Sequence, residues 1–283
     1  MSGTAGTLYV VGTPIGNLED ITLRALGVLK SVGAVVCEDT RHTRKLLDRH
    51  GIVPRALVSL PAFDEKRRAP AVIERLLAGE EVALCTDAGM PLVSDPGGEL
   101  VRLAVEAGVR VVPVPGPSAP LLALAGAGIP ADRFTFFGFL PRKGGARREA
   151  LEALARAPGA LVLFESPRRL GATLVDLREA LGDRRACVAR ELTKLHEEFA
   201  RGSLSELAAR FSGEVLGEIT VVIEGREAIP VEPPDPDDLL RERLAAGASV
   251  KDAAREVAEA TGLPKKDIYR RALELQAGEA APD

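Results

Sequence analysis

Two turns rich in glycine and proline each follow a short apolar segment in the middle of the chain. The segment Val82–Cys85 leads into Thr86-Asp87-Ala88-Gly89-Met90-Pro91, and Val109–Val114 leads into Pro115-Gly116-Pro117-Ser118-Ala119. Glycines let a backbone approach a ligand closely, and a carboxylate such as that of Asp87 accepts hydrogen bonds or attracts a cation. The alternative for Asp87 is an Asx turn that only shapes the loop. Asp95, which precedes Pro96-Gly97, is better explained as a turn former.

The elements expected around these turns place them at one edge of a sheet. Apolar segments at 7–11, 34–37, 58–60, 82–85 and 109–114 alternate with helical patterns at 21–30, 38–45, 69–78 and 99–107. This alternation predicts a mainly parallel sheet with helices on its faces. Ligands of open α/β sheets bind at the carboxyl ends of the strands, so the two turns predict a small-molecule site.

A second block of alternating strands and helices follows, and charged residues lie just after two of its strands. Glu165 and Arg168 follow the expected strand 161–164, and Glu191 and Lys194 follow 186–189. These charges either converge on a cleft or form a solvated rim of ion pairs. We expect an N-terminal α/β domain at 1–116 and a second α/β domain at 117–226.

The C-terminal part of the chain differs in composition from both α/β blocks. The segment 227–238 is acidic and rich in proline, which predicts an extended linker. Three short helical patterns at 239–245, 250–261 and 265–275 predict a small helix-turn-helix-like module at 239–276. Basic residues gather on its last helix and in the polar segment after Leu140, and they are candidates for binding a phosphate backbone: Arg142, Lys143, Arg147, Arg148, Lys266 and Arg270.

Several other classes of protein are disfavoured by the composition. The formal net charge is −4, so a polyanion must be met by local basic patches. The three cysteines lie far apart in the sequence, which favours buried free thiols in a reducing cytosol. The three histidines lack the spacing of a metal site. We see no signal peptide, membrane span, P-loop, Ser-His-Asp arrangement or HExxH sequence. The sequence therefore predicts a cytoplasmic protein without a metal.

Taken together, the motifs resemble the tetrapyrrole methylase superfamily and, within it, the ribosomal RNA small subunit methyltransferase I family. The resemblance spans about residues 7–275 and is carried by these segments: LYVVGTPIGNLEDIT, EDTRHTRKLL, TDAGMPLVSDPG, PGPSA, GFLPRK, ESPRR, ARELTK and GEITVVIEG. One departure is Arg168, where histidine is expected in many members.

The resemblance implies two α/β domains with S-adenosylmethionine (SAM) in the cleft between them, and a homodimer. It also implies methylation of a cytidine 2′-hydroxyl in the decoding region of 16S rRNA, on the small ribosomal subunit. Asp87 and Glu165 are candidates for accepting the hydroxyl proton, and Lys194 or Arg190 for positioning the phosphate. The residues expected to contact SAM are Thr13, Pro14, Asp87, Ala88, Gly89, Met90, Pro91, Ser118, Ala119, Leu140 and Ile219.

Two other functions compete with this one. A methyltransferase acting on a tetrapyrrole or another small molecule would share the fold, but it has no need of a basic C-terminal module. A nucleic-acid-binding regulator that only senses a ligand would not need acids at the strand ends beside the cofactor loops.

Overall fold

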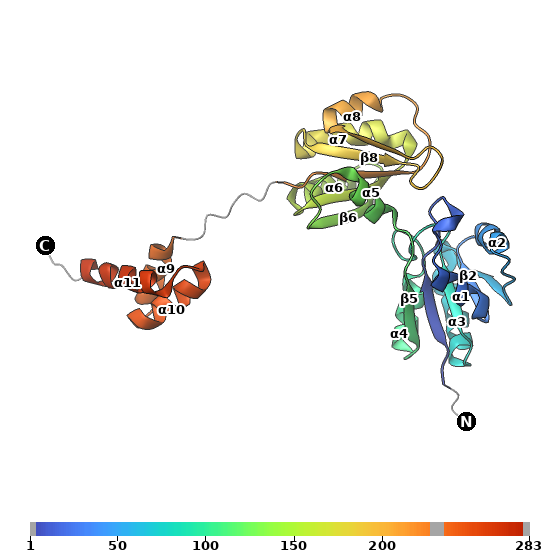
Figure 1. The fold of residues 1–283 in the computed structure, drawn as a ribbon, viewed down its shortest axis with the longest axis horizontal. Coiled ribbons are helices and arrows are strands. Elements are labelled where there is room, and N and C mark those ends of the chain that lie inside the picture. The colour runs from blue at the N-terminus through green and yellow to red at the C-terminus, as the bar shows by residue number, and fades with distance from the viewer. Residues whose placement is uncertain (1–3, 227–234, 280–283) are drawn as a thin grey trace. The chain divides into compact units, whose positions relative to one another are not determined.

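The computed structural model describes residues 4–226 and 235–279, and the chain divides into two compact units, Met1–Arg226 and Glu227–Asp283 (Figure 1). Most of the predicted linker, residues 227–234, lies outside the described residues. The last residues of the predicted linker 227–238 belong to the first helix of the second unit. This helix begins at Pro236 rather than Leu239. The helix begins early because Asp235 accepts a hydrogen bond from the Asp237 amide, and Pro236 suits a first helical position.

The first sheet is parallel throughout, as the sequence predicts. Its strand order is β3-β2-β4-β1-β5, so the turns after β4 and β5 lie on either side of the turn after β1. The strands are β1 (Thr7–Val11), β2 (Ala34–Cys37), β3 (Leu57–Ser59), β4 (Val82–Cys85) and β5 (Arg110–Val114).

Helices cover both faces of this sheet. Buried residues of α1 (Leu23–Ser31) and α2 (Thr40–Arg49) form one core with the strands, and those of α3 (Glu65–Leu77) and α4 (Gly98–Glu106) form another. With both faces covered, β2 and β4 are buried along their whole length, which explains why their sequences read as continuous apolar runs.

The second sheet has the order β6-β7-β10-β8-β9 and is mixed, because only β6 and β7 run parallel. Its strands are β6 (Phe134–Phe139), β7 (Ala160–Glu165), β8 (Arg185–Arg190), β9 (Glu198–Ser203) and β10 (Ile219–Ile223). The sequence did not identify β6 or β9 as strands. Both are edge strands, and β9 has charged residues and a glycine where a buried strand would have an apolar run.

Helices also cover both faces of the second sheet. One core contains α6 (Gly145–Arg156), α7 (Leu170–Leu181) and α8 (Leu204–Arg210), and the opposite core contains α5 (Ala119–Ala127). Ile15, from the turn after β1 of the first sheet, is buried in the α5 core. The two sheets therefore share a hydrophobic contact within the first unit.

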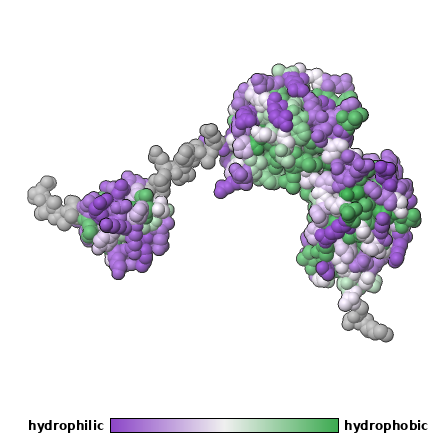
Figure 2. All heavy atoms as spheres, in the orientation of Figure 1, coloured by the Kyte–Doolittle hydropathy of each residue, from purple (hydrophilic) through white to green (hydrophobic). Residues whose placement is uncertain are grey.

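The second unit consists of α9 (Pro236–Ala245), α10 (Val250–Thr261) and α11 (Lys265–Glu279), close to the three predicted helices. Its small core contains Leu240, Val257, Ile268 and three alanines. The face of this unit drawn in Figure 2 is mainly hydrophilic. Across the described ranges 4–226 and 235–279, no helix combines the length and apolarity needed to cross a membrane.

A buried polar network fixes the region between β6 and α7. The Glu165 side chain is fully buried, and it accepts hydrogen bonds from the Thr173 hydroxyl (2.6 Å) and the Ser166 amide (2.7 Å). Arg147 donates to the Thr173 hydroxyl at 3.0 Å and pairs with Asp176 at 2.6 Å. The network ties α6 and α7 to the end of β7.

Replacing Thr173 with valine should destabilise the protein, because it removes a hydrogen bond from the buried Glu165 carboxylate. We expect a loss of about 1–3 kcal/mol in the free energy of unfolding. Urea unfolding followed by circular dichroism measures it. Thr135→Val is the control, because the Thr135 hydroxyl donates to the Pro158 carbonyl at an exposed position. Equal losses in the two variants would show that the network contributes nothing of its own.

Candidate functional site

A cavity of about 380 Å³ opens where the carboxyl ends of the first sheet meet the second sheet. Its volume lies in the range of small-molecule sites. The first sheet contributes the loop after β4 and the start of α5, and the second contributes the ends of β6 and β7, the β8–β9 loop and the start of β10. The lining residues are Ile15, Ala88, Gly89, Met90, Val93, Ser94, Asp95, Ser118, Ala119, Pro120, Phe139, Phe164, Glu165, Ser166, Pro167, Leu192, Gly217, Glu218, Ile219 and Thr220.

Backbone contacts fix the cavity wall that the first sheet provides. Thr13 and Gly89 exchange backbone hydrogen bonds of 2.9 and 3.1 Å, and the Thr13 hydroxyl donates to the Thr86 carbonyl at 3.1 Å. Gly12 and Gly116 lie so close that a Cβ atom on Gly116 would be 2.7 Å from the Gly12 Cα. The turns after β1, β4 and β5 are therefore packed together backbone to backbone.

Residues with strained backbone conformations lie in two of the loops beside the cavity, those after β4 and β8. Leu92 and Ser94 after β4, and Glu191 and Thr193 after β8, have positive φ angles between 50° and 73°. Such conformations cost free energy in residues with a Cβ atom, and they cluster at functional sites. The strain supports the assignment of this cavity as the functional site.

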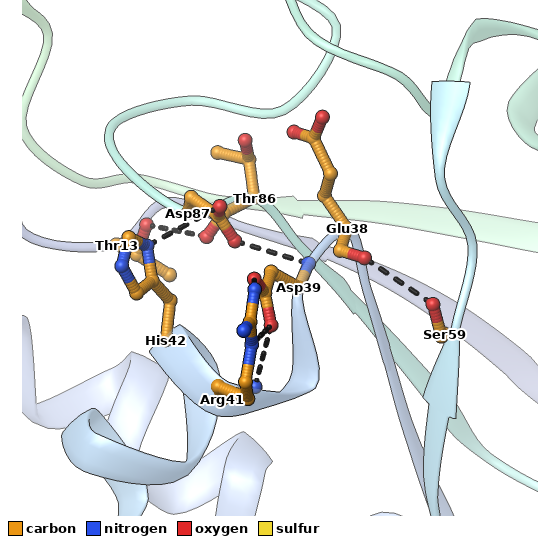
Figure 3. Close-up of polar contacts among 8 residues, drawn as sticks. All are labelled: Thr13, Glu38, Asp39, Arg41, His42, Ser59, Thr86 and Asp87. Carbon is orange, nitrogen blue, oxygen red and sulfur yellow. Dashed lines mark hydrogen bonds and ion pairs between the residues drawn. The ribbon is translucent and has the colours of Figure 1, made fainter. Parts of the chain in front are cut away.

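Acidic residues surround the carboxyl end of β4 (Figure 3). Asp87 accepts a hydrogen bond from the Asp39 amide at 3.2 Å. Burial and the charge of Asp87 raise the pKa of both Glu38 and Asp95, whereas the Arg41 guanidinium lowers the pKa of Asp39. Asp95 lines the cavity, so the first-sheet wall is electronegative and suits a cationic ligand.

About half of the residues predicted to contact the cofactor line this cavity: Ala88, Gly89, Met90, Ser118, Ala119 and Ile219. Ser118 directly precedes α5, and its side chain makes no capping hydrogen bond. Its hydroxyl is thus not engaged by the helix.

The other predicted cofactor residues do not line the cavity. Thr13 supports it by holding Gly89, while Pro14 and Pro91 stand beside lining residues. The Leu140 side chain is buried in the core of the second sheet, and its carbonyl accepts a hydrogen bond from Arg169 at 2.9 Å, so its contact with SAM stays a prediction. Asp87 lies on the other side of its loop, toward Asp39 and His42.

Glu165 and Lys194 are both engaged in internal contacts, and their roles in the reaction stay predictions. Glu165 lines the cavity, and each of its carboxylate oxygens accepts a hydrogen bond inside the protein. The Lys194 ammonium pairs with Glu191 at 2.9 Å and Glu218 at 3.0 Å. Arg168 lines a different hollow, so the charges after β7 and β8 do not all converge.

Five of the six residues predicted to contact RNA are exposed, and one is not. Arg142, Lys143 and Arg148 are exposed, as are Lys266 and Arg270 on α11. Arg147 differs from the expected exposed RNA contact, because its side chain is only 13% exposed and pairs with Asp176. The sequence placed it in a polar loop, whereas α6 begins at Gly145 and turns it toward α7.

Other cavity residues were not identified from the sequence. The turn that contains Asp95 is visible in the sequence, but the sequence favours a structural role for this residue over a place in the cavity. No local sequence pattern points to Phe139, Phe164 or Leu192, because the order of strands in the second sheet is what brings them to the cavity. His42 was considered only as a metal ligand, yet its Nδ1 lies 3.3 Å from the Asp87 Oδ2.

Comparisons with known proteins agree with this geometry. Residues 7–208 match the family model "Tetrapyrrole (Corrin/Porphyrin) Methylases", and residues 230–276 match "RsmI C-terminal HTH domain". The protein named ribosomal RNA small subunit methyltransferase I of Mesorhizobium japonicum is 50% identical over 95% of this chain and 92% of its own length. Its namesake from Micromonospora olivasterospora is 48% identical over 94% and 86%.

A solved structure shares the fold of the first unit. Uroporphyrin-III C-methyl transferase from Thermus thermophilus, complexed with S-adenyl homocysteine, has a TM-score of 0.57 and 23% identity, covering 77% of this chain and 97% of its own. The family suggested by the sequence motifs is thereby confirmed. The chain belongs to the tetrapyrrole methylases, which are SAM-dependent methyltransferases, and within them to the ribosomal RNA small subunit methyltransferase I family.

Proposed function

We propose that this chain transfers the methyl group of SAM to the 2′-hydroxyl of a cytidine in the decoding region of 16S rRNA, on the small ribosomal subunit. The observation that carries the proposal is the cavity lined by Gly89 and Ser118, in a chain whose relatives are named for small subunit rRNA methylation. The predicted homodimer, the cytoplasmic location and the two α/β domain boundaries remain predictions.

The residues around the cavity fit SAM in shape and charge. Gly12 and Gly116 leave no room for side chains, and their close contact holds together the turns that lead to Ile15 and Ser118 in the cavity wall. Phe139 and Phe164, whose ring centroids are 5.4 Å apart, offer an apolar wall. Asp95 supplies negative charge for a cation. The residues proposed to hold SAM are Ala88, Gly89, Met90, Ser118, Ala119 and Ile219.

Bound SAM supplies a methyl group on a positively charged sulfur, which is a good leaving group. The task left to the protein is to hold the ribose hydroxyl in line with that methyl group, and positioning of this kind accounts for much of a rate enhancement. The hydroxyl is weakly acidic, so a nearby proton acceptor adds to the rate.

The alternative functions have less support. A small-molecule methyltransferase would share the cavity, but residues 230–276 match a domain characteristic of the rRNA methyltransferase family. A ligand-sensing regulator would not explain relatives named as methyltransferases across more than nine tenths of the chain.

Replacing Gly116 with alanine should weaken SAM binding, because the new Cβ would lie 2.7 Å from the Gly12 backbone and push the two turns apart. We expect the dissociation constant, measured by calorimetry, to rise roughly tenfold or more, equal to about 1.4 kcal/mol. Gly27→Ala in α1 is the matched control, because nothing lies within 4 Å of a Cβ there. Wild-type affinity in Gly116→Ala would place the SAM site elsewhere.

Reversing exposed basic charges should weaken binding to the small subunit and leave SAM affinity unchanged. The variants are R142E/K143E and K266E/R270E, and each lost phosphate contact should lower the salt slope of binding by roughly one. The control R24E/K30E changes the same net charge on the exposed side of α1. If all three variants lose the same affinity, only net charge matters and the proposed RNA surfaces are wrong.

The target atom can be tested by removing it. Subunits reconstituted with 16S rRNA that carries one 2′-deoxycytidine at the methylated position should accept no labelled methyl group, because the acceptor oxygen is missing. Matched subunits with the unmodified cytidine are the control, and the label should map to the ribose. Transfer to the deoxy substrate, or label on the base, would contradict ribose methylation.

A further inference from the structure

His42 and Asp87 form a pair beside the cavity (Figure 3). His42 is in the first turn of α2, and its Nδ1 lies 3.3 Å from the Asp87 Oδ2. The other Asp87 oxygen accepts a hydrogen bond from the Asp39 amide, so both carboxylate oxygens have a polar neighbour within the protein. The His42 side chain is 58% exposed, and within residues 4–226 no hydrogen bond engages its Nε2.

The pair is next to the proposed SAM site. Asp87 is followed directly by Ala88 and Gly89, which line the cavity. Asp95 also lines the cavity, and the charge of Asp87 contributes to raising the Asp95 pKa, so these carboxylates lie within electrostatic reach of one another. A role of His42 in the reaction requires that a ribose at the rim of the cavity reach its exposed side chain.

The orientation of the imidazole determines what it can do. A carboxylate facing Nδ1 favours the tautomer with a proton on Nδ1, which leaves the lone pair on Nε2 free to accept a proton. Carboxylates hold histidine bases in this way in many hydrolytic enzymes. We propose that His42 is the general base that takes the proton of the ribose 2′-hydroxyl, with Asp87 as its positioning residue, an inference that rests on the proposed function.

The step balances without any further reactant. The O2′–H bond breaks, its electron pair stays on O2′ and forms the new bond to the methyl carbon, and the proton moves to the His42 Nε2. The electron pair of the broken carbon–sulfur bond stays with sulfur. The resulting imidazolium is stabilised by Asp87 and later gives its proton to water.

The other residues that the resemblance suggested for proton transfer or phosphate positioning are less suited as the base. Glu165 is buried with both oxygens hydrogen-bonded, and Asp87 already accepts from Asp39 and faces His42. Lys194 is paired with two glutamates and is positively charged, so it accepts no proton. Among these side chains, only His42 presents a free lone pair at an exposed position.

Charged groups on two segments act on His42. Asp87 faces it from the loop after β4, and Asp39 and Arg41 adjoin it at the start of α2. Glu38 and Asp95 extend the negative field around Asp87. Because the base acts in its neutral form, the rate should fall as pH decreases.

The test compares His42→Gln and Asp87→Asn with the wild-type protein in single-turnover transfer to undermethylated small subunits at saturating SAM. General-base catalysis predicts a rate roughly 10²–10⁴-fold lower in His42→Gln, with SAM affinity by calorimetry unchanged. The fall in rate at low pH that we expect of the wild type should be absent from this variant. His50→Gln is the matched control, because the His50 Nε2 contacts the Leu18 carbonyl outside the cavity.

Nitrogen NMR of the protein without SAM gives a readout independent of activity. The chain has only three histidines, so the His42→Gln and His50→Gln variants assign their signals. His42 should carry its proton on Nδ1 in the wild type and lose that preference in Asp87→Asn. A His42→Gln rate within threefold of wild type, or a wild-type His42 protonated on Nε2, would overturn the inference. If the wild type itself transfers no methyl group to the subunit, the proposed function fails instead.

Discussion

Thr13 and Gly89 exchange two backbone hydrogen bonds, and the rest of the site depends on this contact. It joins the turn after β1 to the turn after β4, while the close approach of Gly12 and Gly116 joins the turn after β1 to that after β5. Three turns at one sheet edge thereby become a single rigid wall. Ile15, from the same turn as Thr13, packs into the second sheet and fixes the opposite wall against it.

This arrangement separates two kinds of chemistry on one loop. Ala88, Gly89 and Met90 face the cavity, whereas Asp87, one residue earlier, faces α2. The proposed cofactor site and the proposed proton acceptor therefore adjoin each other along this loop. The same loop contains strained Leu92 and Ser94, as expected where a short segment must satisfy two partners.

The sequence predicted the fold well where one signal dominated. Continuous apolar runs identified β2 and β4, and glycine turns after β4 and β5 identified the first-sheet wall of the cavity. It failed where tertiary contacts decide a role. Glu165 and Arg147 look like surface charges, yet they meet through Thr173, a partner that only the packing of α6 and α7 brings near. The second-sheet wall depends on β10 lying between β7 and β8, an order that no local pattern encodes.

The most direct test of the account is a crystal structure of the protein with S-adenosylhomocysteine, the product of methyl transfer. We expect the ligand in the cavity between Gly89 and Ser118, with its sulfur toward the end of the cavity next to Asp87 and His42. The turns after β1 and β5 should keep their contact. A ligand bound outside this cavity, or inside it with the sulfur pointing away from His42, would contradict the proposed arrangement of cofactor and base.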